Sequence, residues 1–394
     1  FRRVLFRSMG NTHIVHRFRP GLWREDTFAV TRCTVHVALL LATLVSGVTV
    51  FSAPSLWAFR DYLTPEQKAR LEKIQILRIE ALALTEKGAV DPAPIAELVA
   101  RRMVELGYTV VGDAGKRHDV VLKVKCEEQK IWEGTTAAGG DADLPDAPSR
   151  LWKGPACQLT YLLDGMKVKW QKEVRTEFDD ARQAAQSAHM GDPGAYAMSK
   201  LREGIETYEF PLLLAAEWGQ PERLLKLLDR TDTPQARKVK IISLLGDMQV
   251  GEALPKLTVA LKDPDLAKPA IGAIGNLGKE GIPLLVDIMN TSPQPELQAA
   301  AAKGLGQLGG MHGDVSVVPP LLAKLKDPKT EWPVLTEVAW SLGKIPDKRS
   351  SQPLYDLDKK LEAIRDPENV PLKKLKEAVF WAIKQCDTWD QSVN

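Results

Sequence analysis

The sequence predicts an α+β protein: a small α/β sandwich domain, with a mostly antiparallel sheet and covering helices, precedes an all-α solenoid of about five helical hairpins. Two observations support this prediction. In the middle of the chain, strand-like runs and amphipathic helical patterns surround one Asp-Gly hairpin signal. In the C-terminal part, a helical unit recurs with a period close to 32 residues, which is typical of repeat proteins.

The amino-acid composition excludes several classes of protein. The chain has 394 residues, of which 44% are hydrophobic and 26% charged, a balance that excludes a wholly disordered chain and a polytopic membrane protein. A net charge of +2 offers no electrostatic attraction for nucleic acid, so we expect none as a partner. Four cysteines exclude a disulfide-dense small protein, and six histidines leave little material for a metal site.

The N-terminal part has the pattern of an export signal. Residues 1–8 precede Met9, and we expect them to be a non-native leader. Within residues 9–58, four arginines lie before an uncharged, mostly apolar stretch that begins at Val35. A basic flank followed by an apolar run predicts a signal peptide, or alternatively an N-terminal membrane anchor. We therefore expect an exported protein that is periplasmic, or anchored to the inner membrane and facing the periplasm.

Residues 60–219 predict the α/β domain. Its elements are expected in the order β-α-β-β-β-β-α, and the Asp-Gly pair at 164–165 joins the last two strands as a hairpin. Cys126 and Cys157 lie in strand-like segments and would pair in an oxidising compartment, whereas the alternative is two buried free thiols. This order of elements in an exported chain loosely resembles the small α/β domains of exported envelope proteins of Gram-negative bacteria.

The segment 132–155 reads as a loop. Asp141, Asp143 and Asp146 in it suggest a calcium-binding loop, but the glycine and the closing glutamate of an EF-hand are missing, so we expect no metal. Trp132 and Trp152 flank this loop. They would either pack together and close it or face a ligand.

Residues 220–390 contain the repeats, and 391–394 form a tail. Most units have a proline-containing turn in the middle and Leu-Gly at the end, and the glycines or their equivalents are 32, 31, 34 and 41 residues apart. We expect Asp-Pro to supply a turn that stops the first helix, and we expect the glycine to supply a left-handed cap after the second helix. The longer last unit lacks the glycine, as expected of a terminal cap.

This pattern resembles the HEAT-repeat family of armadillo-like α-solenoids, including its short bacterial variants. The matching residues are the Asp-Pro turns and endings such as Ala273–Gly278 and Ala339–Gly343. The resemblance implies a binding surface or scaffold and transfers no catalytic residue. It also implies that second helices line the concave face, where the candidate partner-binding residues are Trp332, Trp340, Phe380 and Trp381. Aromatic anchors are common hot spots, but these four could instead fill the core between repeats.

No motif for nucleophilic, metal or phosphate chemistry is visible in the sequence. We therefore expect a non-enzymatic scaffold or adaptor that binds a protein partner through its solenoid and requires no cofactor. The alternative is a small-ligand-binding envelope protein that uses the α/β domain and the 132–155 loop. An enzyme of unknown reaction is the remaining option.

Overall fold

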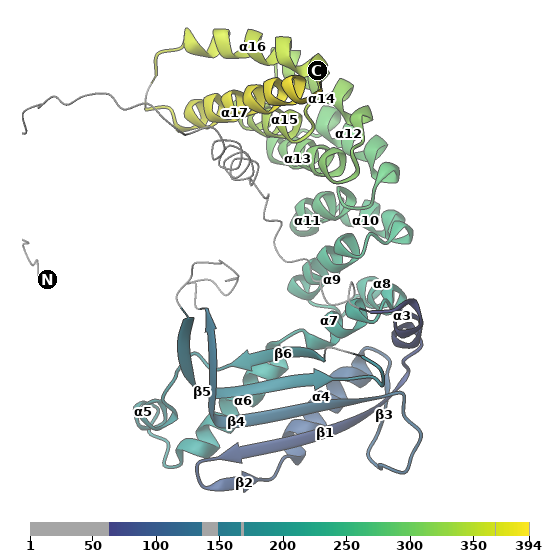
Figure 1. Cartoon of the computed structure of the whole chain (residues 1–394), viewed down its shortest axis with the longest axis vertical. Coiled ribbons are helices and arrows are strands. Elements are labelled where there is room, and N and C mark those ends of the chain that lie inside the picture. Colours follow the sequence, from purple (N-terminus) through teal and green to yellow (C-terminus); the bar gives the residue numbers. More distant parts are fainter. Residues whose placement is uncertain (1–62, 136–148, 167–168, 367, 394) are drawn as a thin grey trace, which may run out of the picture. The chain divides into compact units, whose positions relative to one another are not determined.

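A computed structural model describes residues 63–135, 149–166, 169–366 and 368–393. Strands and helices share the N-terminal part of this range, and only helices follow (Figure 1). The predicted α+β class, an α/β domain followed by helical hairpins, is confirmed. The segments expected to hold the leader, the export signal and the calcium-like loop lie outside the described residues.

The N-terminal part is built on one six-stranded mixed sheet. Its strands are β1 (Ile76–Thr85), β2 (Gly88–Val90), β3 (Thr109–Val111), β4 (Val120–Thr135), β5 (Ser149–Tyr161) and β6 (Trp170–Arg175). The main order is β2-β1-β4-β5-β6, and β3 also pairs with β1. The β1–β4 and β1–β3 pairs are parallel and the other three are antiparallel, because α4 (Ala93–Glu105) carries the chain back after the β1–β2 hairpin.

Helices cover one face of this sheet. Helix α4 packs on β1 and β3, and α6 (Pro193–Thr207) packs on β1, β4, β5 and β6 (Figure 1). Alternate strand residues such as Leu122, Val124 and Leu159 are buried beneath the helices. Two further helices described in this part are α3 (Pro65–Glu72), whose N-cap is Thr64, and α5 (Ala181–Ser187).

The Asp-Gly signal lies in the turn between β5 and β6, where Gly165 has a φ of +81°. The expectation of a loop over 132–155 is wrong at both ends. β4 runs on to Thr135 and β5 starts at Ser149, and their register pairs Trp132 with Trp152. A register shift between Glu127 and Lys130 accommodates Pro155, which cannot donate a ladder hydrogen bond. The two strands are therefore longer than the sequence predicts, because pairing continues into a segment where apolar and polar residues hardly alternate.

The C-terminal part contains five helical hairpins. Their pairs are α8 (Pro221–Asp229) with α9 (Gln235–Asp247), α10 (Leu254–Ala260) with α11 (Pro264–Ile274), α12 (Ile282–Thr291) with α13 (Pro295–His312), α14 (Val318–Lys326) with α15 (Trp332–Lys344), and α16 (Lys348–Glu362) with α17 (Val370–Val393). Each second helix packs on the second helix of the next hairpin. The described residues thus agree with the predicted number of units.

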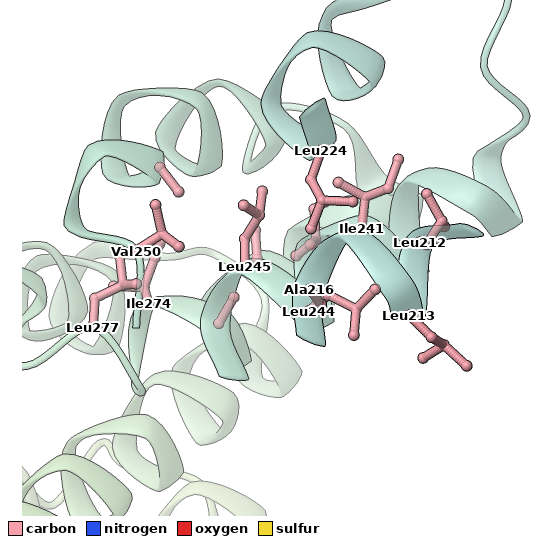
Figure 2. Close-up of a cluster of buried hydrophobic side chains, with 14 of the residues drawn as sticks. Leu212, Leu213, Ala216, Leu224, Ile241, Leu244, Leu245, Val250, Ile274 and Leu277 are labelled. Atoms are coloured by element: carbon pink, nitrogen blue, oxygen red, sulfur yellow. The ribbon is translucent and has the colours of Figure 1, made fainter. Parts of the chain in front are cut away.

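Helix α7 (Phe210–Glu217) connects the two parts through a continuous apolar core. Every residue of α7 is buried, and the helix packs on both α8 and α9. In Figure 2, Leu212, Leu213 and Ala216 of α7 lie in one cluster with Leu224 of α8 and side chains of α9 and α11. Because the end repeat of a solenoid needs a cover, we infer that α7 supplies it for the first hairpin.

The repeat signature keeps its expected role at one turn and departs from it elsewhere. Asp327 is the C-cap of α14, as expected of an Asp-Pro turn that stops the first helix. Asp263 caps the start of α11, with its carboxylate accepting a hydrogen bond from the Asp265 backbone N–H, so this Asp-Pro pair begins the second helix. Of the Leu-Gly endings, only Gly278 has a positive φ. The corresponding Gly246, Gly309 and Gly343 lie inside helices, where a side chain would collide with the next repeat.

A matched pair of glycines tests this role. A Cβ on Gly306 of α13 would lie 2.7 Å from Ser341 Cα on α15, whereas Gly272 of α11 has no heavy atom within 4 Å of that position. We expect Gly306→Ala to lower the free energy of unfolding by about 1–3 kcal/mol through overpacking. Gly272→Ala should instead raise it by up to about 1 kcal/mol through helix propensity. Urea unfolding measures the free energy of unfolding of both variants. Equal changes in the two variants would contradict the role of Gly306 in the packing of α13 on α15.

Candidate functional site

The aromatic candidates of the repeats divide into two groups. Trp340 on α15 and Trp381 on α17 contact each other, with ring centroids 4.9 Å apart and planes tilted by 49°. Phe380, next to Trp381, is 58% exposed, and the Lys384 ammonium lies 5.0 Å from its ring centroid. Trp332 begins α15 and packs on the core away from this pair. Two of the four predicted residues therefore meet at the α15–α17 contact, and Phe380 is exposed on α17 next to Trp381 in the sequence.

Gly343 explains how Trp381 is held. A Cβ at Gly343 would lie 2.7 Å from Trp381 Cε3 and 2.9 Å from Ala382 Cα. The indole therefore lies directly over the α15 backbone and also contacts Trp340. Both tryptophans keep part of their surface accessible. They therefore combine the two roles that the sequence left open, because each fills space between repeats and also contributes to the surface.

Polar side chains continue this surface across neighbouring second helices. Gln307 on α13 donates to Asn276, just beyond α11, with a nitrogen–oxygen distance of 2.6 Å. Lys344 at the end of α15 lies against α13, because a Cβ on Gly310 would be 3.6 Å from Lys344 Cβ. Partial burial lowers the pKa of Lys344, and the Lys303 ammonium lowers it further, while Glu337 opposes this effect. Sequence reasoning missed these lysines because lysine is common on exposed helices.

A second polar network lies where α8 meets the α/β part. Gln220 donates to the carbonyl oxygens of Leu71 and Ile74, at 3.0 Å each, and accepts from the Tyr108 hydroxyl at 2.7 Å. Arg223 donates to the Leu106 carbonyl at 3.0 Å, and its guanidinium lies 3.8 Å from the Tyr108 ring centroid. Burial raises the pKa of Tyr108. These buried contacts tie the first repeat to α3 and to the short segments just before β1 and β3.

The α/β domain has a groove of 840 Å³ between its edge strand β6 and α6. Phe178 and Tyr196 stack in its wall, with ring centroids 5.7 Å apart. Burial raises the pKa of Tyr208, which also lines the groove. Thr176 of the groove donates to the backbone oxygen of Pro155, at the end of the segment 132–155. The structure describes no side chain at Trp132 or Trp152.

The cysteines of the described residues form one disulfide and one free thiol. Cys126 and Cys157 are directly opposite each other on β4 and β5 and are joined as a disulfide. Cys386 is a buried free thiol, and burial raises its pKa. Within the described residues, no group of three His, Cys, Asp or Glu side chains could hold a metal ion. No helix in the same ranges is long and apolar enough to span a membrane.

Comparison with known proteins agrees with this helical architecture. A family model described as HEAT repeats matches residues 221–306 and 282–366. Residues 221–366 therefore carry HEAT repeats. No curated protein matches the chain. A solved structure of human deoxyhypusine hydroxylase in complex with glycerol is 16% identical over 52% of this chain and 90% of that one, with a TM-score of 0.25. A likeness at this level carries no functional argument.

Proposed function

We propose that this chain is a non-enzymatic scaffold or adaptor that binds a protein partner through the second helices of its HEAT repeats. The observation that carries the proposal is the exposed Phe380 beside the partly accessible Trp340–Trp381 pair. Aromatic side chains on a rigid helical surface are typical anchors of protein interfaces, because they offer large contact areas at low entropic cost. The proposal includes export, which rests on the basic and apolar N-terminal pattern alone.

A position-specific crosslinking experiment in cells tests this proposal. A photoreactive phenylalanine analogue at position 380 lies on the proposed interface. The control is position 259, because Val259 is 65% exposed on the first helix α10. We expect a discrete crosslinked protein from position 380 and none from position 259.

The groove between β6 and α6 supports a second candidate, a small-ligand-binding envelope protein. Its volume of 840 Å³ and its stacked aromatic wall suit a small organic molecule. This candidate differs from the sequence-based alternative in its position, since that alternative used the 132–155 loop. Ligand screening by thermal shift tests this candidate, with the Tyr196→Ala variant as the comparison. A compound that raises the unfolding temperature of the parent chain but not of the variant would favour ligand binding in the groove.

A further inference from the structure

Glu128 is a carboxylate at the end of an apolar row of the sheet. On the helix-covered face of β4, the alternating residues Leu122, Val124 and Cys126 are buried. Glu128 continues this row and is only 4% exposed. Within the described residues it forms no ion pair, and its one hydrogen bond is accepted by Oε2 from the Glu86 backbone N–H at 2.8 Å. A buried carboxylate without a counter-charge is costly, so we expect a cation beside it.

The Oε2 side of this carboxylate is closed. A Cβ on Gly194, in the first turn of α6, would lie 3.0 Å from Glu128 Oε2. Glu128 also lines a cavity of 380 Å³. The oxygen that remains for a ligand is therefore the one that has no hydrogen-bond partner within the described residues.

The lining of this cavity has an excess of negative charge. Its walls come from β4, β5, the turn between β1 and β2, and the start of α5. The charged lining residues are four carboxylates, Glu86, Glu128, Asp179 and Asp180, and two cations, Lys153 and Arg182. The formal charge of the lining is therefore −2. Lys87 and Lys130, on adjoining parts of the chain, already form ion pairs with Asp192 and Glu173 and do not supply the missing charge.

Backbone contacts hold these carboxylates around the cavity. Asp180 caps α5, and its carboxylate accepts from the backbone N–H groups of Arg182 and Gln183 at 2.9 and 3.1 Å. Glu86 pairs with the Arg182 guanidinium at 3.3 Å, while its backbone N–H is bonded to Glu128. Like charges therefore remain close together in a partly enclosed space. A cation in the cavity would relieve their repulsion.

We propose that this cavity binds a small aliphatic diamine. One ammonium group donates a hydrogen bond to the unpaired oxygen of Glu128, and the other lies near the carboxylates of Asp179 and Asp180. A dication matches the formal charge of −2, and a short alkyl chain suits a volume far larger than a single metal ion. The cavity shares no lining residue with the groove between β6 and α6. The inference does not depend on the proposed scaffold function.

Isothermal titration calorimetry with the full chain tests the site with matched probes. The compound 1,4-diaminobutane carries two charges, butylamine carries one, and 1,4-butanediol carries none. We expect the diamine to bind, with an affinity that falls as salt is added. Butylamine should bind at least about tenfold more weakly, because one charged hydrogen-bonding group is lost, and the diol should not bind. The amide of Nα-acetyl-lysine presents one ammonium as a protein side chain would, and it should bind as weakly as butylamine.

Glu128→Gln removes the buried charge with little change of shape. The amide oxygen can still accept the Glu86 N–H, and the diamine should bind at least about tenfold more weakly. The matched control is Glu127→Gln, which makes the same change of charge one residue earlier. Glu127 pairs with Lys125 at 2.8 Å and does not line the cavity, so this variant should keep the affinity of the parent chain. Asp179→Asn, on the opposite wall, should also weaken binding.

Three results would overturn the inference: no binding of the diamine, equal binding of the diamine and the diol, or equal effects of Glu128→Gln and Glu127→Gln. If Glu128→Gln does not fold, Asp179→Asn takes its place in the last comparison. Calcium chloride that binds more tightly than the diamine would assign the cavity to a metal ion and would likewise overturn the inference. The crosslink from position 380 tests the scaffold function separately, so the two proposals can fail independently.

Discussion

Arg223→Met is expected to lower the free energy of unfolding by about 3 kcal/mol, because it removes a buried guanidinium that bridges two parts of the fold. Arg223 donates to Gln220, Leu106 and Gln75 and stacks on Tyr108. Methionine fills much of the same volume but leaves the Leu106 carbonyl and the Gln75 side-chain oxygen without this donor. Each buried acceptor that loses its partner costs about 1–3 kcal/mol.

The matched control for this variant is Lys226→Met, one turn later on the same helix. Lys226 is exposed and forms no ion pair within the described residues, so its replacement should change stability by less than about 0.5 kcal/mol. Urea unfolding, followed by circular dichroism, distinguishes the two. If both variants behave alike, the network around Gln220 does not hold the first repeat to the α/β part.

Reduction of the Cys126–Cys157 disulfide is expected to cost about 3–4 kcal/mol, because the bond closes a long loop in the unfolded chain. The two residues are 31 positions apart and fully buried on adjacent strands. The unfolding midpoint of the parent chain should therefore fall when reductant is added. A variant with both Cys126→Ala and Cys157→Ala should show one midpoint with and without reductant.

Cys386→Ala provides the control for general effects of thiol chemistry. Cys386 lies in α17, is buried and has no disulfide partner. This variant should keep the full response of the parent chain to reductant. A parent chain whose midpoint is unchanged by reductant would show that the two thiols are not bonded in solution. It would also remove one support for an oxidising compartment.

The repeats could be predicted from the sequence because their information is local and recurs. The spacing of the Leu-Gly endings predicts the five hairpins, and the Asp-Gly pair predicts the turn between β5 and β6. The role of the glycines could not be read in this way. A Cβ on Gly246 or Gly343 would collide with atoms of the next repeat. The need for glycine at these positions therefore depends on helix packing and not on the local chain.

The same limit applies to the candidate site. Gln220 bonds to residues nearly 150 positions earlier in the chain, and no local pattern marks such a partner. The sequence did single out Trp340 and Trp381 as large residues on second helices, but not their contact across two repeats. Lys344 has no local signal either, since the partial burial that lowers its pKa depends on the packing of α15 against α13.

The crosslinking comparison between positions 380 and 259 tests the central claim most directly. Both positions are exposed, and they lie on a second and a first helix respectively. The account predicts a discrete protein adduct from position 380, reproducible between cultures, with no matching adduct from position 259. The same adducts from both positions, or none from position 380, would contradict a partner-binding role for the second helices.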